Sequence, residues 1–320
     1  MPMDEPAQKI LLTCITNPIG KALAQTFESD AIPFVVVSPN QIDWSDAALV
    51  DELFARVSPF LLINTLSLDA RYRAEHTAFA KQIATASSRH EVQVIHFSDY
   101  HVFGGEAKNT YYETDKPAPL TDFGTSLVTA EQCFIEHLSQ YFILRVSWLL
   151  SFEKDNLLTR LLSRLESNDV IQLSEDYRGS PTWTHDVARV TVGIVKQIIT
   201  GADNWGVFHY CSEDKCSEWE FGALIAEQFT DIKRNDFHIS RIKDASRRLR
   251  AVPLAQRDDE EGLIVQQEPA SAVLSCRRIR NNFGIQPRTW RQGLKAQIRN
   301  WLQDNSADAG SNHNKVDAVS

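Results

Sequence analysis

The first 150 residues alternate continuously apolar runs with amphipathic stretches, and this alternation constrains the fold more than any other feature. Apolar runs without polar alternation are typical of strands buried on both faces of a parallel sheet. The runs occupy residues 9–16, 32–38, 59–67, 92–98 and 141–149. Since the stretches between them have helical character, the sequence predicts an α/β fold with a doubly wound parallel sheet. Such sheets bind ligands at the carboxyl ends of their strands.

After residue 150 the alternation of apolar runs and amphipathic stretches becomes less regular. We expect helices at 156–167, 217–229 and 288–304, a strand at 205–212 and a polar loop at 244–270. The sequence therefore predicts a Rossmann-type lobe over 1–150 and a smaller C-terminal α/β substrate lobe over 151–302. Some helices and strands of the second lobe should return to the sheet. The small, polar stretch 303–320 predicts a disordered tail.

Charge and composition exclude several classes of function. The 320 residues carry a formal net charge of −9 and no basic stripe, which argues against binding to nucleic acid. No apolar run approaches the roughly 18 residues that span a bilayer, and the acidic N-terminus does not resemble a signal peptide. The five cysteines are scattered without a CxxC pair, so we expect a reduced, cytoplasmic protein without a metal site.

The turn after the first apolar run, "TCITNPIGKAL", has the position of a pyrophosphate-binding turn. Glycines there let the backbone approach phosphates, and the helix N-terminus supplies N–H donors. The three glycine positions hold Cys14, Asn17 and Gly20. Asn17 can partly replace glycine if the turn needs a positive φ. Two interpretations stay open: a cofactor turn that includes Thr16 and Ile19, or a tight β–α turn without a cofactor.

The residues after the second apolar run do not distinguish NAD from NADP. It continues as "VVVSPNQID", with no acid placed for a ribose 2′-hydroxyl and no arginine placed for a 2′-phosphate. Asp43 is either a contact to the adenine edge or an exposed turn aspartate. Asn64, within the third apolar run, and Ser98, at the end of the fourth, complete the set of candidate cofactor-binding residues.

Several motifs, taken in order, resemble the dTDP-4-dehydrorhamnose reductases of the extended short-chain dehydrogenase/reductase group. The resemblance covers roughly residues 9–302. It rests on the segments "VIHFSDYHVFGG", "YYETDKPAPLTDFG", "ILRVSWLL", "DYRGSPTWTHDVAR" and "WGVFHYCSEDKCSEWEFGALI". It implies NAD or NADP as cofactor and a 4-keto nucleotide sugar as ligand. The group also has non-enzymatic relatives, such as the regulatory β subunit of methionine adenosyltransferase.

The family's catalytic residues are missing where the resemblance would place them. Its tyrosine falls at Phe123 and its lysine at Leu127, while its catalytic Thr or Ser falls at Asp99, with Ser98 beside it. Phenylalanine cannot donate a proton, and leucine cannot lower a neighbour's pKa. Tyr100 is the candidate for a substitute acid.

Two functional hypotheses follow. The first is a catalytically degenerate protein that binds NAD(P) or a sugar nucleotide and has a binding or regulatory role, either as a homo-oligomer or with a protein partner. The second is an active reductase of a 4-keto nucleotide sugar that uses a non-standard acid. Under the first hypothesis, Phe123 and Leu127 lie four residues apart on one helix face and should partly fill the cofactor cleft.

Overall fold

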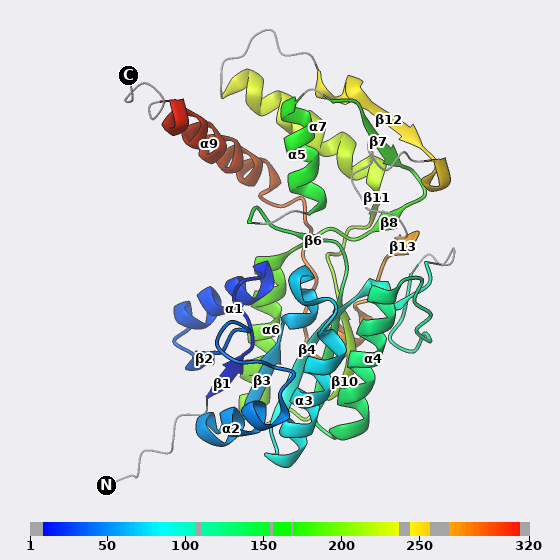
Figure 1. Ribbon diagram of the computed structural model, residues 1–320. Coiled ribbons are helices and arrows are strands. Elements are labelled where there is room, and N and C mark those ends of the chain that lie inside the picture. The colour runs from blue at the N-terminus through cyan, green and yellow to red at the C-terminus, as the bar shows by residue number, and fades with distance from the viewer. Residues whose placement is uncertain are drawn as a thin grey trace.

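The computed structural model has two lobes, which meet at the carboxyl ends of a central sheet (Figure 1). The structure describes residues 9–105, 110–153, 156–167, 169–236, 244–256 and 269–313. The larger lobe contains the sheet and the helices on its two faces. The smaller lobe lies beyond the strand ends, so that the loops between the lobes surround the place where this fold binds ligands.

The central sheet is six-stranded and parallel, in the order β10-β5-β4-β3-β1-β2. Its strands are β1 (Ile10–Leu12), β2 (Phe34–Val36), β3 (Leu61–Asn64), β4 (Gln93–Asp99), β5 (Tyr141–Val146) and β10 (Gly206–Tyr210). The order reverses direction between β1 and β3, which is the switch point at which doubly wound sheets bind their ligands. The predicted doubly wound sheet is confirmed, and β10 shows that the second half of the chain returns to it.

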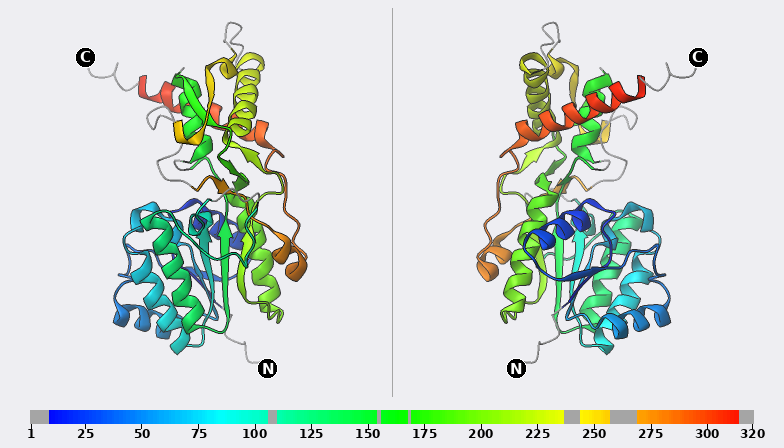
Figure 2. Two further views of the ribbon diagram at one scale, coloured as in Figure 1. Left: turned by 90° about the vertical axis from the view of Figure 1, so that its right-hand side faces the viewer. Right: turned by 90° about the vertical axis from the view of Figure 1, so that its left-hand side faces the viewer.

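Helices cover both faces of the sheet (Figure 2). One face carries α1 (Pro18–Ser29) and α6 (Thr184–Ile199), and the other carries α2 (Ala47–Val57), α3 (His76–Arg89) and α4 (Asp122–His137). Two separate apolar cores result, one beneath each layer of helices. Burial on both faces explains why the strands of this sheet lack polar alternation.

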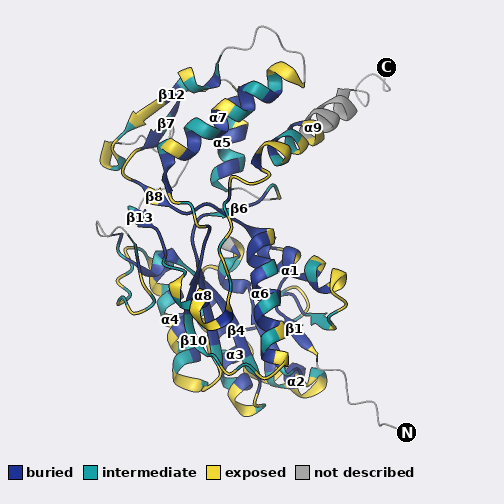
Figure 3. Cartoon of the chain, turned by 180° about the vertical axis from the view of Figure 1, so that it is seen from behind, coloured by how far each residue is buried: buried dark blue, intermediate teal, exposed yellow. Residues whose placement is uncertain are grey.

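A third core holds the smaller lobe together around α5 (Leu157–Ser167) and α7 (Glu218–Asn235). Figure 3 shows their buried faces turned inward. Ser217 caps α7 through a capping box with Glu220, as expected for a serine at the helix start. The lobe also contains α9 (Leu294–His313) and short strands: β6 (Leu149–Leu150), β7 (Ile171–Ser174), β8 (Arg178–Gly179), β9 (Thr182–Trp183), β11 (Cys216–Ser217), β12 (Leu249–Val252) and β13 (Ser271–Ala272).

Three expectations for the C-terminal part differ from the structure. The helix expected from residue 288 begins only at Leu294. Residues 249–252, predicted as loop, form β12 and pair in parallel with β7. Residues 303–313, predicted as the start of a disordered tail, continue α9; residues 314–320 lie outside the described part. Adding residues to an existing helix is much easier than starting one, so the preceding turns, anchored by Ile298 and Leu302, extend into this polar stretch.

The helices of the described segments include none that is both long and apolar enough to cross a membrane.

Candidate functional site

The turn between β1 and α1 is folded tightly against the end of its own strand. A Cβ atom added at Gly20 would lie 1.9 Å from the carbonyl oxygen of Cys14, so only glycine fits there. This is the close helix–strand packing that the last glycine of a dinucleotide turn provides. Pro18 occupies the first turn of α1, where its missing N–H costs nothing. The side chains of Cys14 and Ile19 are buried.

Asn17 has a different role from the one its type suggested. Its φ is −98°, so the predicted use of asparagine for a positive φ is wrong. Instead Asn17 caps α1: its Oδ1 accepts the Gly20 N–H at 2.8 Å. Its Nδ2 donates to the carbonyl oxygen and hydroxyl of Thr65 at 3.0 and 3.2 Å. The side chain thus joins the turn to the end of β3.

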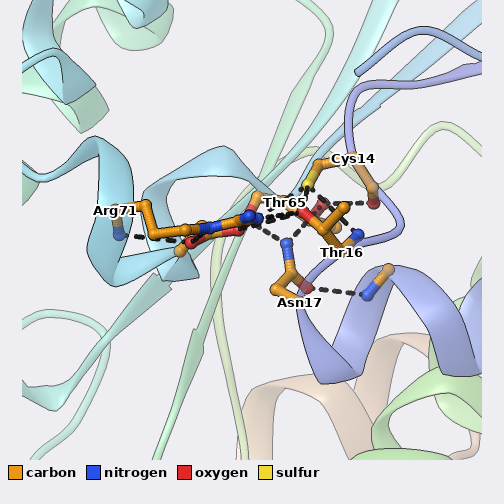
Figure 4. Close-up of polar contacts among 7 residues, drawn as sticks. Cys14, Thr16, Asn17, Thr65 and Arg71 are labelled. Carbon is orange, nitrogen blue, oxygen red and sulfur yellow. Dashed lines mark hydrogen bonds and ion pairs between the residues drawn. The ribbon is translucent and has the colours of Figure 1, made fainter. Parts of the chain in front are cut away.

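An ion pair lies directly over this turn (Figure 4). Asp69, only 2 % exposed, receives two bonds from Arg71, with Nε–Oδ1 at 2.9 Å and Nη2–Oδ2 at 2.6 Å. The Thr16 hydroxyl donates to Asp69 Oδ2 at 3.2 Å and also contacts the Arg71 guanidinium. Hydrogen bonding to Asp69 raises the pKa of Arg71 further above its usual value. A carboxylate and its counterion therefore lie beside the turn that phosphates approach in this fold.

A cavity of about 510 Å³ opens beside this cluster, between the lobes. Its described lining includes three arginines, Arg71, Arg73 and Arg160, and a single carboxylate, Asp69. The first residues of α1 and α6 also line it, and a helix N-terminus favours anions. The lining therefore favours an anionic ligand.

A second, more open cavity of about 590 Å³ follows the end of β2. Residues 39–45 form one side, and Tyr72 contributes to the other. Asp43 is exposed here, and its carboxylate accepts from the Ser45 N–H at 2.8 Å and the Ser45 hydroxyl at 2.6 Å. The hydroxyl bond, the larger cause, lowers the pKa of Asp43. In a doubly wound fold this edge takes the adenosine half of a dinucleotide.

The two remaining candidates for cofactor contact, Asn64 and Ser98, are buried at the ends of the central strands. Asn64 is 2 % exposed and joins strand ends: its Nδ2 donates to His96 Nδ1 at 3.0 Å, and its Oδ1 accepts from Thr13 at 3.3 Å. Ser98 is fully buried at the end of β4, and its hydroxyl meets no hydrogen-bond partner among the described residues. Asn64 therefore organises the strand ends, whereas Ser98 is closed off and lines neither of the two cavities.

The first turns of α4 hold Phe123 and Leu127, where the resemblance leads us to expect the family's tyrosine and lysine. Leu127 is fully buried in the core of the smaller lobe. Phe123 is half-buried, with the guanidinium of Arg73 4.3 Å above its ring and the ring of His101 5.1 Å away in an edge-on contact. Phe123 thus occupies its position with a cation–π contact and an aromatic contact.

Polar groups next to Phe123 come from the end of β4. Tyr100 is 7 % exposed, and its hydroxyl lies 3.1 Å from that of Tyr177 in the smaller lobe. Asp99 Oδ1 accepts the His101 N–H at 2.8 Å and lies 2.8 Å from His101 Nδ1. The structure therefore gathers Asp99, Tyr100 and Phe123 around His101.

Sequence reasoning missed Asp69, Arg71 and Arg73. All three follow β3, where a ligand would bind, in the segment "LDARYRAEH". They lie in the connection before α3, which begins at His76. Two arginines directly after a buried parallel strand were the available signal.

The comparisons with known proteins agree with this architecture. Residues 8–302 match the family model described as RmlD substrate binding domain. The dTDP-4-dehydrorhamnose reductase of Aggregatibacter actinomycetemcomitans is 24% identical, over 90% of this chain and 97% of its own length. The spore coat polysaccharide biosynthesis protein SpsK of Bacillus subtilis is 25% identical, over 93% of this chain and 98% of its own.

Solved structures show the same fold. The dTDP-4-dehydrorhamnose reductase of Clostridium acetobutylicum superposes with a TM-score of 0.76 at 21% identity, covering 92% of this chain and 100% of the other. The Bacillus anthracis dTDP-4-dehydrorhamnose reductase in complex with NADP gives 0.71 at 21% identity, over 92% and 99% of the two chains. With a family model that matches nearly its whole length, this chain belongs to the RmlD substrate-binding family of dTDP-4-dehydrorhamnose reductase-like proteins.

Proposed function

We propose that this protein binds a nucleotide ligand, either NAD(P) or a nucleotide sugar, between its lobes and does not carry out the standard ketone reduction of its relatives. Its role is then binding or regulation. The observation that carries the proposal is the start of α4, which presents the half-buried Phe123 and the fully buried Leu127. The resemblance leads us to expect a hydroxyl and an ammonium group at these two positions.

The missing groups have a large expected effect on rate. Ketone reduction needs a hydride and a proton for the developing alkoxide. A positioned general acid contributes about 10²–10⁴-fold, and stabilisation of the oxyanion contributes on the order of 10²–10³-fold. The hydroxyl of Tyr100, the expected substitute acid, lies 3.1 Å from the hydroxyl of Tyr177, and either of the two can be the donor.

The packing of the turn and the lining of the inter-lobe cavity support ligand binding. The turn keeps the one glycine that its packing demands, and the inter-lobe cavity is lined by three arginines and helix N-termini. A related protein of the same fold is an NADP complex. The Asp69–Arg71 pair beside the turn predicts a cost for a dinucleotide, because its pyrophosphate would have to be accommodated next to a buried carboxylate.

The test of binding is a titration of the protein with NADH and NADPH, followed by nicotinamide fluorescence, in parallel with dTDP followed by calorimetry. Micromolar binding of any of the three supports the proposal. The absence of binding up to millimolar concentration of all three would refute it. An Arg73→Gln variant is expected to weaken binding, while Arg89→Gln, on the outer surface in an ion pair with Asp51, serves as a matched control.

One observation favours a second candidate function, an active reductase with a different acid. The Asp99–His101 pair lies at the carboxyl end of β4, and the imidazole contacts the ring of Phe123. A carboxylate that holds one imidazole nitrogen fixes the orientation of the ring, and histidine is the side chain that most often transfers protons in catalysis. Under this hypothesis the native protein oxidises NADPH with a 4-keto nucleotide sugar, and His101→Asn abolishes the reaction. Under the first, native and variant are equally inactive.

A further inference from the structure

Two cysteines lie side by side where the lobes join. Cys211 directly follows β10, and Cys276 directly precedes α8 (Arg277–Phe283). Their sulfur atoms are 3.6 Å apart. The Cys276 thiol also accepts the Cys211 N–H at 3.2 Å and contacts the Cys211 carbonyl oxygen at 3.4 Å. Although 65 residues apart in the sequence, the two thiols are therefore held in direct contact.

The pair sits on two connections between the lobes. The chain leaves the sheet after β10 and enters the smaller lobe at β11; it returns after β13 into α8. Helix α8 packs beside β10 (Figure 3), with Phe283 against the ring of Phe208 at 5.4 Å. A bond between the two sulfurs would tie the outgoing connection to the returning one. It would close a loop that contains α7, β12 and β13.

We propose that Cys211 and Cys276 are an oxidation site at which a peroxide forms a reversible disulfide that fastens the junction of the lobes. One thiolate attacks the peroxide, which breaks the O–O bond and gives a sulfenic acid and hydroxide or water. The second thiol attacks that sulfur, forms the S–S bond and releases water. Overall, two thiols and one hydrogen peroxide give one disulfide and two waters, and a dithiol reductant reverses the oxidation.

The local environment suits this sequence of steps. Cys276 is partly exposed, so small oxidants can reach the pair, whereas Cys211 is 1 % exposed. The hydrogen bond from Cys276 lowers the pKa of Cys211, and the same interaction raises that of Cys276. Whichever of the two thiols reacts with the peroxide first, the other lies 3.6 Å away, in position to form the disulfide. To form the bond, the sulfurs must close from 3.6 Å to about 2.05 Å.

The test uses the full-length protein, treated with hydrogen peroxide or with dithiothreitol, then alkylated and digested with trypsin. Cleavage after Lys215 separates Cys211 from Cys216, so each falls on its own peptide. We expect a linked Cys211–Cys276 peptide after peroxide, an intact mass lower by two hydrogens, and loss of both after reduction. Alkylation of Cys276 without any linked peptide, or its oxidation to sulfinic acid, would overturn the proposal.

Two variants sharpen the result. Cys276→Ser keeps a hydroxyl in place of the thiol and should lose the link, while Cys133→Ser, at a partly exposed cysteine on α4, should keep it. Closing so long a loop should also raise the melting temperature of the oxidised native protein by on the order of 5 °C. A link that persists in Cys276→Ser would contradict the assignment. If that variant does not fold, the linked peptide of the native protein still decides.

Discussion

Replacing Asn17 by alanine tests whether this side chain closes the turn onto β3. The substitution removes three hydrogen bonds from a residue that is 2 % exposed: the cap on the Gly20 N–H and two bonds to Thr65. Loss of an N-cap costs about 1 kcal/mol, and loss of each buried bond costs about 0.5–1.5 kcal/mol. We therefore expect the free energy of unfolding to fall by about 2–4 kcal/mol in total.

A second helix of the same lobe provides the matched control. Asp46 caps α2 by accepting the N–H groups of Ala48 and Leu49 at 2.8 and 3.1 Å, but it is exposed. Asp46→Ala should therefore cost only the cap, about 1 kcal/mol. The difference between the two variants isolates the bonds from Asn17 to Thr65.

Urea unfolding of both variants, followed by circular dichroism, measures this difference. The midpoint should fall further for Asn17→Ala than for Asp46→Ala, with an unchanged dependence on urea. Equal shifts in the two variants would refute the claim that Asn17 joins the turn to β3. Binding of NADPH should weaken only in Asn17→Ala, because that turn borders the inter-lobe cavity.

Three further predictions concern the site and its surroundings. Leu127→Lys should lower the free energy of unfolding, measured in urea, by about 3–5 kcal/mol, because it places an unpaired ammonium in a fully buried position. Phe123→Tyr, at a half-buried position, should lower it by less than about 1 kcal/mol. Equal losses in the two variants would contradict the burial argument. Gly20→Ala should prevent folding into the native state, seen as loss of the cooperative urea transition, because its Cβ would meet the Cys14 carbonyl oxygen; a native-like transition would show that the turn can open. Burial lowers the pKa of His96 from 6.5 to about 3. Between these two pH values the unfolded chain binds a proton at His96 and the folded chain does not. The free energy of unfolding should therefore fall as the pH drops from about 6.5 toward 3, by up to about 1.4 kcal/mol per pH unit for this group. His96→Gln should flatten that dependence, and an unchanged slope would assign it to other groups.

The sheet could be predicted from the sequence because its strands are buried on both faces. Each then appears as a continuous apolar run, and the helices between them keep an apolar stripe. The short strands of the smaller lobe carry no such pattern: β12, for example, pairs with β7 across a long stretch of chain. Their existence depends on pairing between distant segments, which local sequence does not encode.

The carboxyl ends of the strands could be predicted as the place of the candidate site, but the contacts there could not. The assignment of Phe123 and Leu127 to the family's catalytic positions stays a prediction from the motifs around them. The role of Asn17 depends on Thr65, which is 48 residues away and could not be inferred from the turn itself. The Asp69–Arg71 pair was missed for the same reason, since its meaning comes from its contact with Thr16 across the switch point.

The most direct test of the central claim is the oxidation of NADPH, followed by absorbance, when the native protein is mixed with dTDP-4-dehydrorhamnose. A chain with Phe123 and buried Leu127 at the start of α4 should turn over at least about 10²-fold more slowly than an ordinary reductase. The same preparation should still bind a nucleotide ligand in the titration. Turnover at an ordinary enzymatic rate by the native protein would contradict the account.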